Sequence, residues 1–320
     1  MIGGYDMILT ENKHFELHKV KEGIYAAIAK DGGGAVGNAG FIDLGDKTVV
    51  FDTFNTQQAA LELKKCAEEM TNKPVSWVVN SHYHGDHIRG NQVFPSSNLL
   101  SSELTYKKAK DIQPERIKGQ KQDIDGLENY IQTLQSKYNE TKAQKTLTQI
   151  HFLQEILESL PTLTLTLPSS TFLEAFTIHG TERTARLFTR GAGHSPCDTF
   201  LYLPEDEIIF MGDLLFVKTH PSFFDESDLD NWMHTLQELS TWNIQTAIPG
   251  HGPLGTKTDF YQIIQYIKDV MKLAESEEDA ADIKIPSSYK DWALKELFEK
   301  NLKQLTHIHK NKMEVSSIHD

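Results

Sequence analysis

Ser81-His82-Tyr83-His84-Gly85-Asp86-His87 decides the fold of this 320-residue sequence, because it places four metal-binding side chains in six consecutive positions. Imidazole nitrogen and carboxylate oxygen are ligands that a borderline cation such as zinc accepts. His82 and His84 are two residues apart and share one face of an extended segment. Asp86 and His87 are adjacent and reach one site only if the backbone turns, which the glycine of this stretch permits. The spacing therefore predicts two metal sites, one with each pair.

Two alternatives to a catalytic metal site are weaker. A solvated polar loop would rarely follow an apolar run such as Val75–Val79 so closely. A structural zinc site usually contains cysteine and closes at four ligands, and this stretch has no cysteine. The apolar run itself is typical of a strand covered on both faces. It would deliver the histidines at its carboxyl end, where open α/β sheets tend to carry their sites.

Composition narrows the partners that we expect. The formal net charge is −13, and a surface this acidic repels phosphate backbones, so we expect no nucleic acid as a partner. No segment reads as a secretory signal or a membrane span. The two cysteines, Cys66 and Cys197, are too few for a disulfide framework. We therefore expect a cytoplasmic protein that acts on a small molecule away from membranes.

Short alternating segments fill the first half of the chain. They predict paired strands within 15–28, turned at Glu22-Gly23, and a hairpin of 41–44 and 48–51 around Gly45-Asp46. The three glycines at 32–34 read as a loop, because no Gly-Lys-Ser/Thr ending follows them. Thr56 is the expected N-cap of a helix whose apolar face would carry Leu61, Leu63, Cys66 and Met70.

The segment from about 101 to 160 is long, polar and helical in character. Apolar residues step by three and four in two runs, Ile124, Leu127, Ile131, Leu134 and Tyr138, then Ile150, Leu153, Leu157 and Leu160. With 139–141 as the turn, the runs predict two antiparallel helices in contact along one seam. Periodicity does not separate a hairpin that completes the core from a lid or a homodimer interface.

The second half returns to strands and ends in helices. Strands are predicted at 162–167, 172–178, 186–189, 199–203, 208–211 and 246–248. Helices are predicted at about 228–240, 258–274 and 287–306, the last with Ser288 and Asp291 as a capping pair. We expect residues 1–320 to form a single domain, with a helical insertion at about 101–160 and C-terminal helices at about 258–306.

Three further segments offer ligands where predicted strands stop. They are Gly193-His194-Ser195-Pro196, Met211-Gly212-Asp213 and Pro249-Gly250-His251-Gly252-Pro253. Strand ends at one edge of a sheet converge, so His194, Asp213 and His251 would join the opening motif. Seven ligands result, which is what two four- or five-coordinate ions sharing a carboxylate and a water require.

The order of these motifs, from the strands near Asn38 to His251, resembles the metallo-β-lactamase superfamily. The resemblance implies an α/β (α+β) fold, a four-layer αββα sandwich, with the helical hairpin outside the common pattern. It also implies a first metal on His82, His84 and His194, a second on Asp86, His87 and His251, and Asp213 as the bridge between them. Asp52 matches the family's early aspartate, which orients the site, although a helix-start carboxylate is an equal reading of the residue alone.

The resemblance further implies a dinuclear metallohydrolase, with zinc as the expected metal and manganese or iron as alternatives. A hydroxide on the two metals would attack an ester, thioester, lactone or amide carbonyl, and Asp86 would pass the proton. Asp213 stands where true zinc β-lactamases carry a cysteine, so the chain is more similar to the glyoxalase, lactonase and general-hydrolase branches. The chain differs from flavodiiron relatives, which have glutamate where His84 stands. It also differs from the nuclease branch, whose large extra domain does not fit in the short segment between Asp213 and His251. Two alternatives stay open, a mononuclear iron persulfide dioxygenase and a catalytically silent binding or scaffold protein.

Four other residues lie close to the expected ligands in sequence. Tyr83, Lys218 and His220 are candidates to face the substrate, although a structural role is the simpler interpretation for each. Cys197 is likewise better read as a packing residue than as a redox sensor, because it is an isolated thiol.

Overall fold

The first sheet of the computed structural model, which describes residues 8–276 and 280–317, contains eight strands. In chain and sheet order they are β1 (Ile8–Glu11), β2 (Phe15–Lys21), β3 (Ile24–Ala29), β4 (Ala39–Asp43), β5 (Thr48–Phe51), β6 (Val75–Val79), β7 (Asn98–Ser102) and β8 (Ser170–Phe172). Strands β1 to β5 pair antiparallel, and β5 to β8 pair parallel. The change to parallel pairing places the end of β6 beside the end of β5.

The second sheet is formed by the later strands, in the order β13-β12-β11-β10-β9. Their bounds are β9 (Ala175–His179), β10 (Thr184–Thr189), β11 (Thr199–Leu203), β12 (Ile208–Phe216) and β13 (Thr246–His251). Only β12 and β13 are parallel among these neighbours, because α6 connects them across the outer face.

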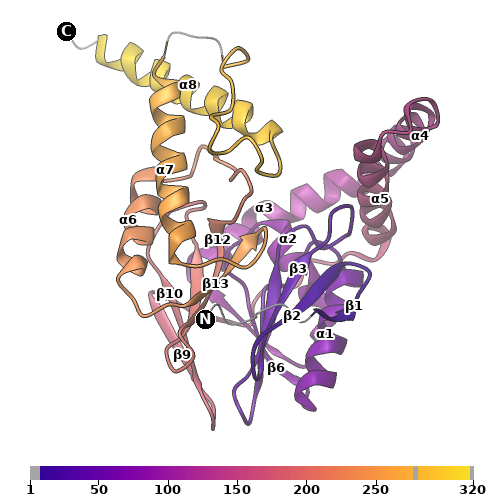
Figure 1. Ribbon diagram of the computed structural model, residues 1–320. Helices are drawn as coiled ribbons and strands as arrows, with labels where there is room; N and C mark the ends of the chain where they lie inside the picture. The colour runs from indigo at the N-terminus through magenta and orange to yellow at the C-terminus, as the bar shows by residue number, and fades with distance from the viewer. Residues whose placement is uncertain (1–7, 277–279, 318–320) are drawn as a thin grey trace.

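Helices cover and extend the two sheets (Figure 1). They are α1 (Gln57–Thr71), α2 (Gly85–Ile88), α3 (Glu103–Gln122), α4 (Ile124–Thr141), α5 (Gln144–Ser159), α6 (Leu229–Ser240), α7 (Lys257–Ala274) and α8 (Glu296–Ser317), with short 3-10 turns η1 (Arg89–Val93) and η2 (Leu160–Thr162). Thr56 accepts a hydrogen bond from the Ala59 backbone N–H and so caps α1 as predicted.

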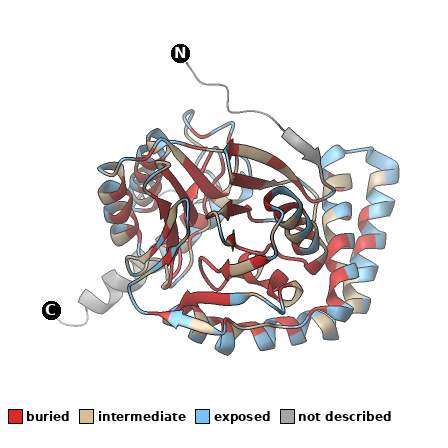
Figure 2. Ribbon diagram, turned by 90° about the horizontal axis from the view of Figure 1, so that it is seen from below, coloured by how far each residue is buried: buried red, intermediate tan, exposed pale blue. Residues whose placement is uncertain are grey.

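The core has three apolar layers, which confirms the predicted four-layer αββα architecture. Between the sheets, Phe51 from β5 packs against Phe210 from β12, with ring centroids 5.6 Å apart. On one outer face α1 covers the first sheet through residues such as Leu63. On the other, α6 and α7 cover the second sheet around the fully buried Trp232. Figure 2 shows buried residues concentrated on the facing sheets and exposed residues on the outer sides of the helices.

The helical insertion stands at the edge of the sandwich, at the right of Figure 1. Helices α4 and α5 meet along the predicted seam, where Ile131, Leu134 and Ile150 are buried. The turn lies at Lys142 (φ 53°) rather than at 139–141, because α4 continues to Thr141. The Gln57 side chain donates to the Ser159 carbonyl at 2.8 Å, which ties the end of α5 to α1.

Two strand predictions in the second half are wrong. Residues 162–167 alternate polar and apolar, but they follow η2 as an irregular segment. Gln92 and Asn91 side chains satisfy its backbone at Thr164 and Thr166, so it needs no neighbouring strand. The predicted strand at 172–178 is divided into β8 and β9, which belong to different sheets. The chain bends at an exposed Leu173 between them.

Two element limits and the buried face of one helix also differ from the predictions. The last helix begins at Glu296 rather than 287, and Ser288 and Asp291 do not cap it, because residues 286–295 form turns that bury Tyr289 and Trp292 against α7. In α1, Leu63 and Cys66 are buried, but Leu61 and Met70 are exposed. The strand predicted at 208–211 continues to Phe216, with a register shift around Gly212 (φ 52°).

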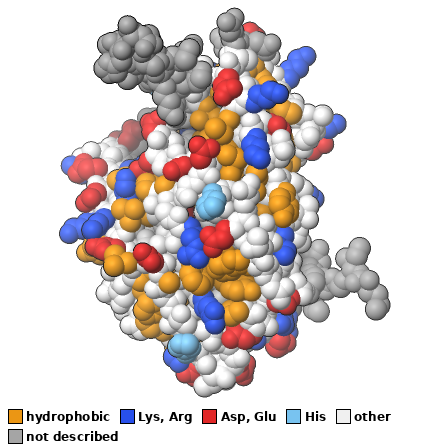
Figure 3. Space-filling model, turned by 90° about the vertical axis from the view of Figure 1, so that its left-hand side faces the viewer, with side chains coloured by type: hydrophobic (Ala, Val, Ile, Leu, Met, Phe, Trp, Pro, Cys, Tyr) orange, Lys and Arg blue, Asp and Glu red, His pale blue; other side chains and the backbone are white. Residues whose placement is uncertain are grey.

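The face opposite the insertion is chemically mixed. Figure 3 shows acidic and basic side chains interspersed with apolar ones on the side where α6 lies, without an extended patch of one sign. Within the described ranges, no helix combines the length and apolar character needed to cross a bilayer.

Candidate metal centre

The loop after β6 is anchored by Asp52, at the end of β5. Its buried carboxylate accepts hydrogen bonds from the Ser81 backbone N–H and hydroxyl, both at 2.7 Å. The loop is also joined to the second sheet, because the Thr199 N–H donates to the Ser81 carbonyl at 2.8 Å. Parallel pairing of β5 with β6 brings these groups together, so the strand order positions the ligand-bearing loop.

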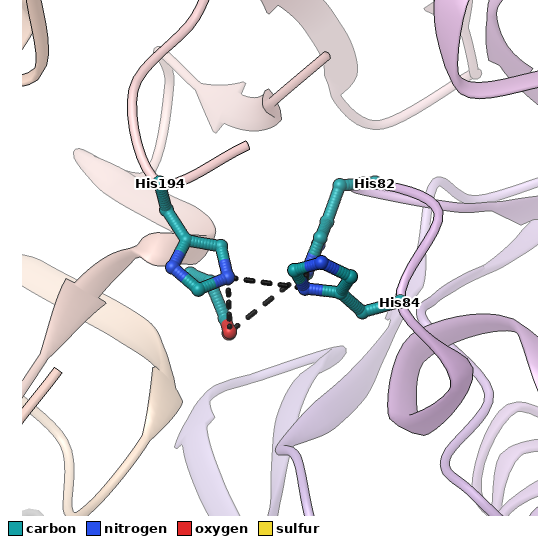
Figure 4. A group of neighbouring side chains, drawn as sticks. His82, His84 and His194 are labelled. Carbon is teal, nitrogen blue, oxygen red and sulfur yellow. Dashed lines mark hydrogen bonds and ion pairs between the residues drawn. The ribbon is translucent and has the colours of Figure 1, made fainter. Parts of the chain in front are cut away.

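His82, His84, His194 and Asp213 form the first group of possible ligands, and their ligand atoms all lie within 4.8 Å of one another. His84 Nδ1 is 2.9 Å from His82 Nε2 and 3.1 Å from His194 Nε2. His194 Nε2 is also 3.2 Å from an Asp213 oxygen. Figure 4 shows His194 facing His82 and His84 from the opposite side of the centre. The loop after β6, the loop between β10 and β11, and strand β12 thus contribute to a single cluster.

Asp86, His87 and His251 form the second group, again within 4.8 Å. His87 Nε2 and His251 Nε2 lie 3.5 Å and 3.4 Å from the same Asp86 oxygen. Asp213 reaches this group too, with one oxygen 3.2 Å from His87 Nε2 and the other 3.4 Å from His251 Nε2. Its carboxylate therefore lies between the two groups.

Hydrogen bonds on the outer nitrogens fix the orientation of three imidazoles. Asp52 lies 2.8 Å from His87 Nδ1, the Ser81 hydroxyl 2.9 Å from His82 Nδ1, and the Ser222 carbonyl 3.1 Å from His194 Nδ1. A partner on Nδ1 leaves Nε2 directed at the centre with its lone pair available. Asp52 thus orients His87 and the ligand-bearing loop without facing the centre itself, which is the position that the resemblance implied.

Close backbone approach at Gly250 makes room for the shared carboxylate. A Cβ at this position would lie 2.0 Å from an Asp213 oxygen and 2.7 Å from the Gly212 carbonyl carbon. Gly212 itself has φ 52° and carries Asp213 out of the regular ladder of β12. Both glycines are therefore required for the position of Asp213.

The protonation states suit cation binding. Burial lowers the pKa of His84 to about 3 and holds the pKa of His82 well below its usual value. Burial opposes ionisation of Asp86 and Asp213, but the neighbouring imidazoles bring the pKa of each carboxyl well below its usual value. Burial likewise opposes a charge on His251, yet Asp213 and Asp86 raise its pKa to about 9. The carboxylates thus hold positive charge at this centre.

Two buried atoms show that a cation fits. Among the described side chains, His87 Nε2 and Asp213 Oδ1 are buried without a hydrogen-bond partner. The nitrogens of His82, His84 and His194 converge on one another, an arrangement that a shared cation would satisfy. The donor set of nitrogen and carboxylate oxygen is one that zinc, manganese and iron accept.

The structure brings all seven predicted ligands together, but it places the other candidates elsewhere. The Tyr83 hydroxyl donates to Glu226, and His220 lies among Tyr266, Trp292 and Phe298. Cys197 is buried in a small apolar cluster, and burial raises the pKa of its thiol to about 11, which suits packing rather than redox sensing. Lys218 is exposed.

Sequence reasoning missed Asn38, Arg89 and Arg116. The Asn38 side chain donates to the Pro249 and Gly252 carbonyls, at 3.0 Å and 2.8 Å, and so joins β13 to the first sheet. Arg89 and Arg116 line a cavity of about 760 Å³ that begins at Asp86 and extends to the helical insertion. Only the position of Arg89, two residues after His87, could have drawn attention to it.

Comparison with known proteins gives one family. The profile of the metallo-β-lactamase superfamily matches residues 32–251. A metallo-β-lactamase from Pontibacter korlensis has a similar structure, with a TM-score of 0.55 and 16% identity over 82% of this chain and 99% of that chain. VMB-1 is similar at a TM-score of 0.56 and 17% identity, over 81% of this chain and 99% of its own. At such identities the likeness shows the fold alone.

Proposed function

Because the chain belongs to the metallo-β-lactamase superfamily, we propose that it is a hydrolase that holds two divalent cations and acts on a small molecule. The observation that carries this proposal is the sharing of Asp213 between two groups of ligands. His82, His84 and His194 would hold one cation, and Asp86, His87 and His251 the other. We propose zinc, with manganese or iron as the alternatives.

When bound, the two cations supply Lewis acidity for a water molecule and for a substrate carbonyl oxygen. Asp86 is the residue of this chain that we propose to move the proton. Its side chain lines the cavity and is 21% exposed, whereas Asp213 is 5% exposed. A carboxylate in that position can accept a proton from water and return it to the leaving group.

The other residues around the centre orient the groups that act. Asp52, Ser81 and the Ser222 carbonyl hold three imidazoles in position through their outer nitrogens. Their hydrogen bonds keep the donor atoms in place before substrate binds, which avoids reorganisation during the reaction. We propose the carbonyl of an ester, thioester, lactone or amide as the target, in a substrate of a size that the 760 Å³ cavity accommodates.

We further propose a cytoplasmic location. Cys66 and Cys197 are both buried and form no disulfide, which suits a reducing compartment.

The proposal is tested by measuring metal content together with hydrolysis of chromogenic esters, thioesters, lactones and a cephalosporin. We expect two divalent ions per chain and turnover of at least one class. His84→Ala and Asp213→Ala should each lose hydrolysis and bound metal while the circular dichroism spectrum is retained. His234→Ala, which changes an exposed histidine of α6, is the matched control and should keep both.

Three results would contradict the proposal. Full hydrolysis by His84→Ala or Asp213→Ala would show that the altered residue is not a metal ligand that hydrolysis requires. One iron per chain with oxygen consumption on a persulfide would indicate a dioxygenase. A protein that binds no metal and turns over nothing would be a binding or scaffold protein.

A further inference from the structure

The cavity beside the metal centre is lined by two arginines and by apolar side chains. Arg89 lies in η1, close in sequence to the proposed ligand Asp86, which also lines the cavity, and Arg116 lies in α3. Leu127 from α4 and Phe152 from α5 line the far side. The insertion is therefore part of the cavity that adjoins the proposed catalytic residues.

Arg89 is a buried cation with unused hydrogen-bonding capacity. It is only 8% exposed, yet the one hydrogen bond that its guanidinium donates to a described residue goes to Asn55 Oδ1, at 3.3 Å. Its buried Nε has no partner among the described residues. The guanidinium is held over Gly85, since a Cβ there would lie 2.6 Å from Nε. Such a group is normally paired when buried.

Arg116 adds a second positive charge to the same cavity. Both residues line the same cavity, Arg89 from η1 and Arg116 from α3, so their positive charges add there. Within the described ranges, neither arginine forms an ion pair with a carboxylate of the chain. Two guanidinium groups that line one cavity attract an anion into it, and carboxylate or phosphate fits their fork geometry.

The two acidic residues that line the cavity, Asp86 and Asp123, do not form ion pairs with the arginines. Asp86 belongs to the proposed metal ligands, where cations offset its charge. Asp123 lies against the backbone of Gly126 at the start of α4, since a Cβ there would be 2.1 Å from its oxygen. The arginines are thus left for a ligand that enters from solvent.

The opposite wall suits a hydrocarbon. Leu127, Phe152 and Ile156 belong to the apolar cluster that α4 and α5 form with α3, and each also lines the cavity. Burying the methylene groups of a ligand against this wall removes apolar surface from water and so tightens binding.

We infer that this cavity takes a small amphipathic anion, whose carboxylate or phosphate group is held by Arg89 and Arg116 and whose hydrocarbon part lies against the helical insertion. The inference rests on the proposed function only in naming this anion as the substrate of the metal centre. It assigns to the insertion a role in choosing the substrate.

The test is calorimetric titration of the zinc-loaded protein with octanoate, octyl phosphate, butyrate and octanol. We expect one of the two octyl anions to bind at least about tenfold more tightly than octanol, which identifies the head group. Arg116→Gln changes an exposed residue and should weaken binding of that anion about tenfold. Lys118→Gln, an exposed change on the same helix, is the matched control and should leave it unchanged.

Two further arms keep the test independent of folding and of catalysis. Leu127→Ala should lower the octanoate-to-butyrate affinity ratio at least about threefold, because it removes apolar surface from the wall. In a folded variant, Arg89→Gln should weaken anion binding as Arg116→Gln does. Because a buried change can unfold the protein, the exposed change Arg116→Gln decides the test. Equal binding of octanol and both anions, or anion binding unchanged in Arg116→Gln, would overturn the inference even if the protein hydrolyses esters. If the protein hydrolyses none of the substrates but binds the anion, and Arg116→Gln weakens that binding, the anion site is supported and only the proposed function is refuted.

Discussion

Gly250→Ala tests how closely the site depends on the position of Asp213. The new Cβ would lie 2.0 Å from an Asp213 oxygen, more than 1 Å inside the 3.4 Å at which ordinary contact begins. The same Cβ would lie 2.7 Å and 2.8 Å from backbone atoms of Gly212, so the methyl group meets rigid backbone as well as the carboxylate. The carboxylate must shift by about 1 Å, and a displacement of that size at a reacting centre costs on the order of 100-fold in rate.

The assay is kcat/KM on whichever ester, thioester or lactone the wild-type protein hydrolyses, with bound metal measured on the same sample. We expect a loss of about 100-fold in kcat/KM and fewer than two metal ions per chain, with the far-ultraviolet spectrum unchanged. Gly119→Ala is the matched control, because a Cβ there meets nothing within 4 Å. It lies in α3 and should raise stability by about 0.5–1 kcal/mol without changing the rate. Wild-type kcat/KM and metal content in Gly250→Ala would refute the assignment of Asp213 as the shared ligand.

Three further predictions follow from the same geometry. Asp52→Asn should weaken metal binding about 10- to 100-fold, because both carboxylate oxygens of Asp52 accept hydrogen bonds and an amide has only one accepting oxygen. Competition with a zinc-binding dye measures this, and an unchanged affinity would contradict a role for Asp52 in the site. Chelation should lower the melting temperature, since ions that bind only the folded chain stabilise it by about 2.7 kcal/mol at 100 times their Kd; an unchanged melting temperature would contradict this. In chelated protein, His251 has a folded pKa of about 9 against an ordinary 6.5, so its stabilisation is complete below pH 6.5 and lost as the pH rises towards 9. His84 has a folded pKa of about 3, so it opposes folding as the pH falls below 6.5. Melting temperatures of the chelated protein should therefore peak near pH 6.5, with the decline at higher pH reduced in His251→Ala; a decline of the same size in that variant would contradict the role of His251.

The sequence was sufficient for the architecture because the local patterns and the ligand motifs agree. Apolar alternation located most of the paired strands, and the seven ligands lie after β6 and β10 or within β12 and β13, which the fold brings together. The hairpin seam of α4 and α5 was readable from a spacing of three and four residues.

Other features depend on contacts that no local pattern contains. Residues 162–167 alternate like a strand, yet the side chains of Gln92 and Asn91 replace a strand partner. The crossing from β8 to β9 moves the chain from one sheet to the other within a few residues. Arg89 and Arg116 are 27 positions apart in sequence and line one cavity because α3 packs beside α2, where Ala109 and Ile88 share an apolar cluster.

The central claim is that one chain holds two cations on either side of Asp213. Anomalous diffraction at the zinc absorption edge, from crystals of the zinc-loaded protein, tests this directly. We expect two peaks per chain, one among His82, His84 and His194 and one among Asp86, His87 and His251, with the Asp213 carboxylate between them. A single peak, or two peaks of which neither contacts Asp213, would contradict the account.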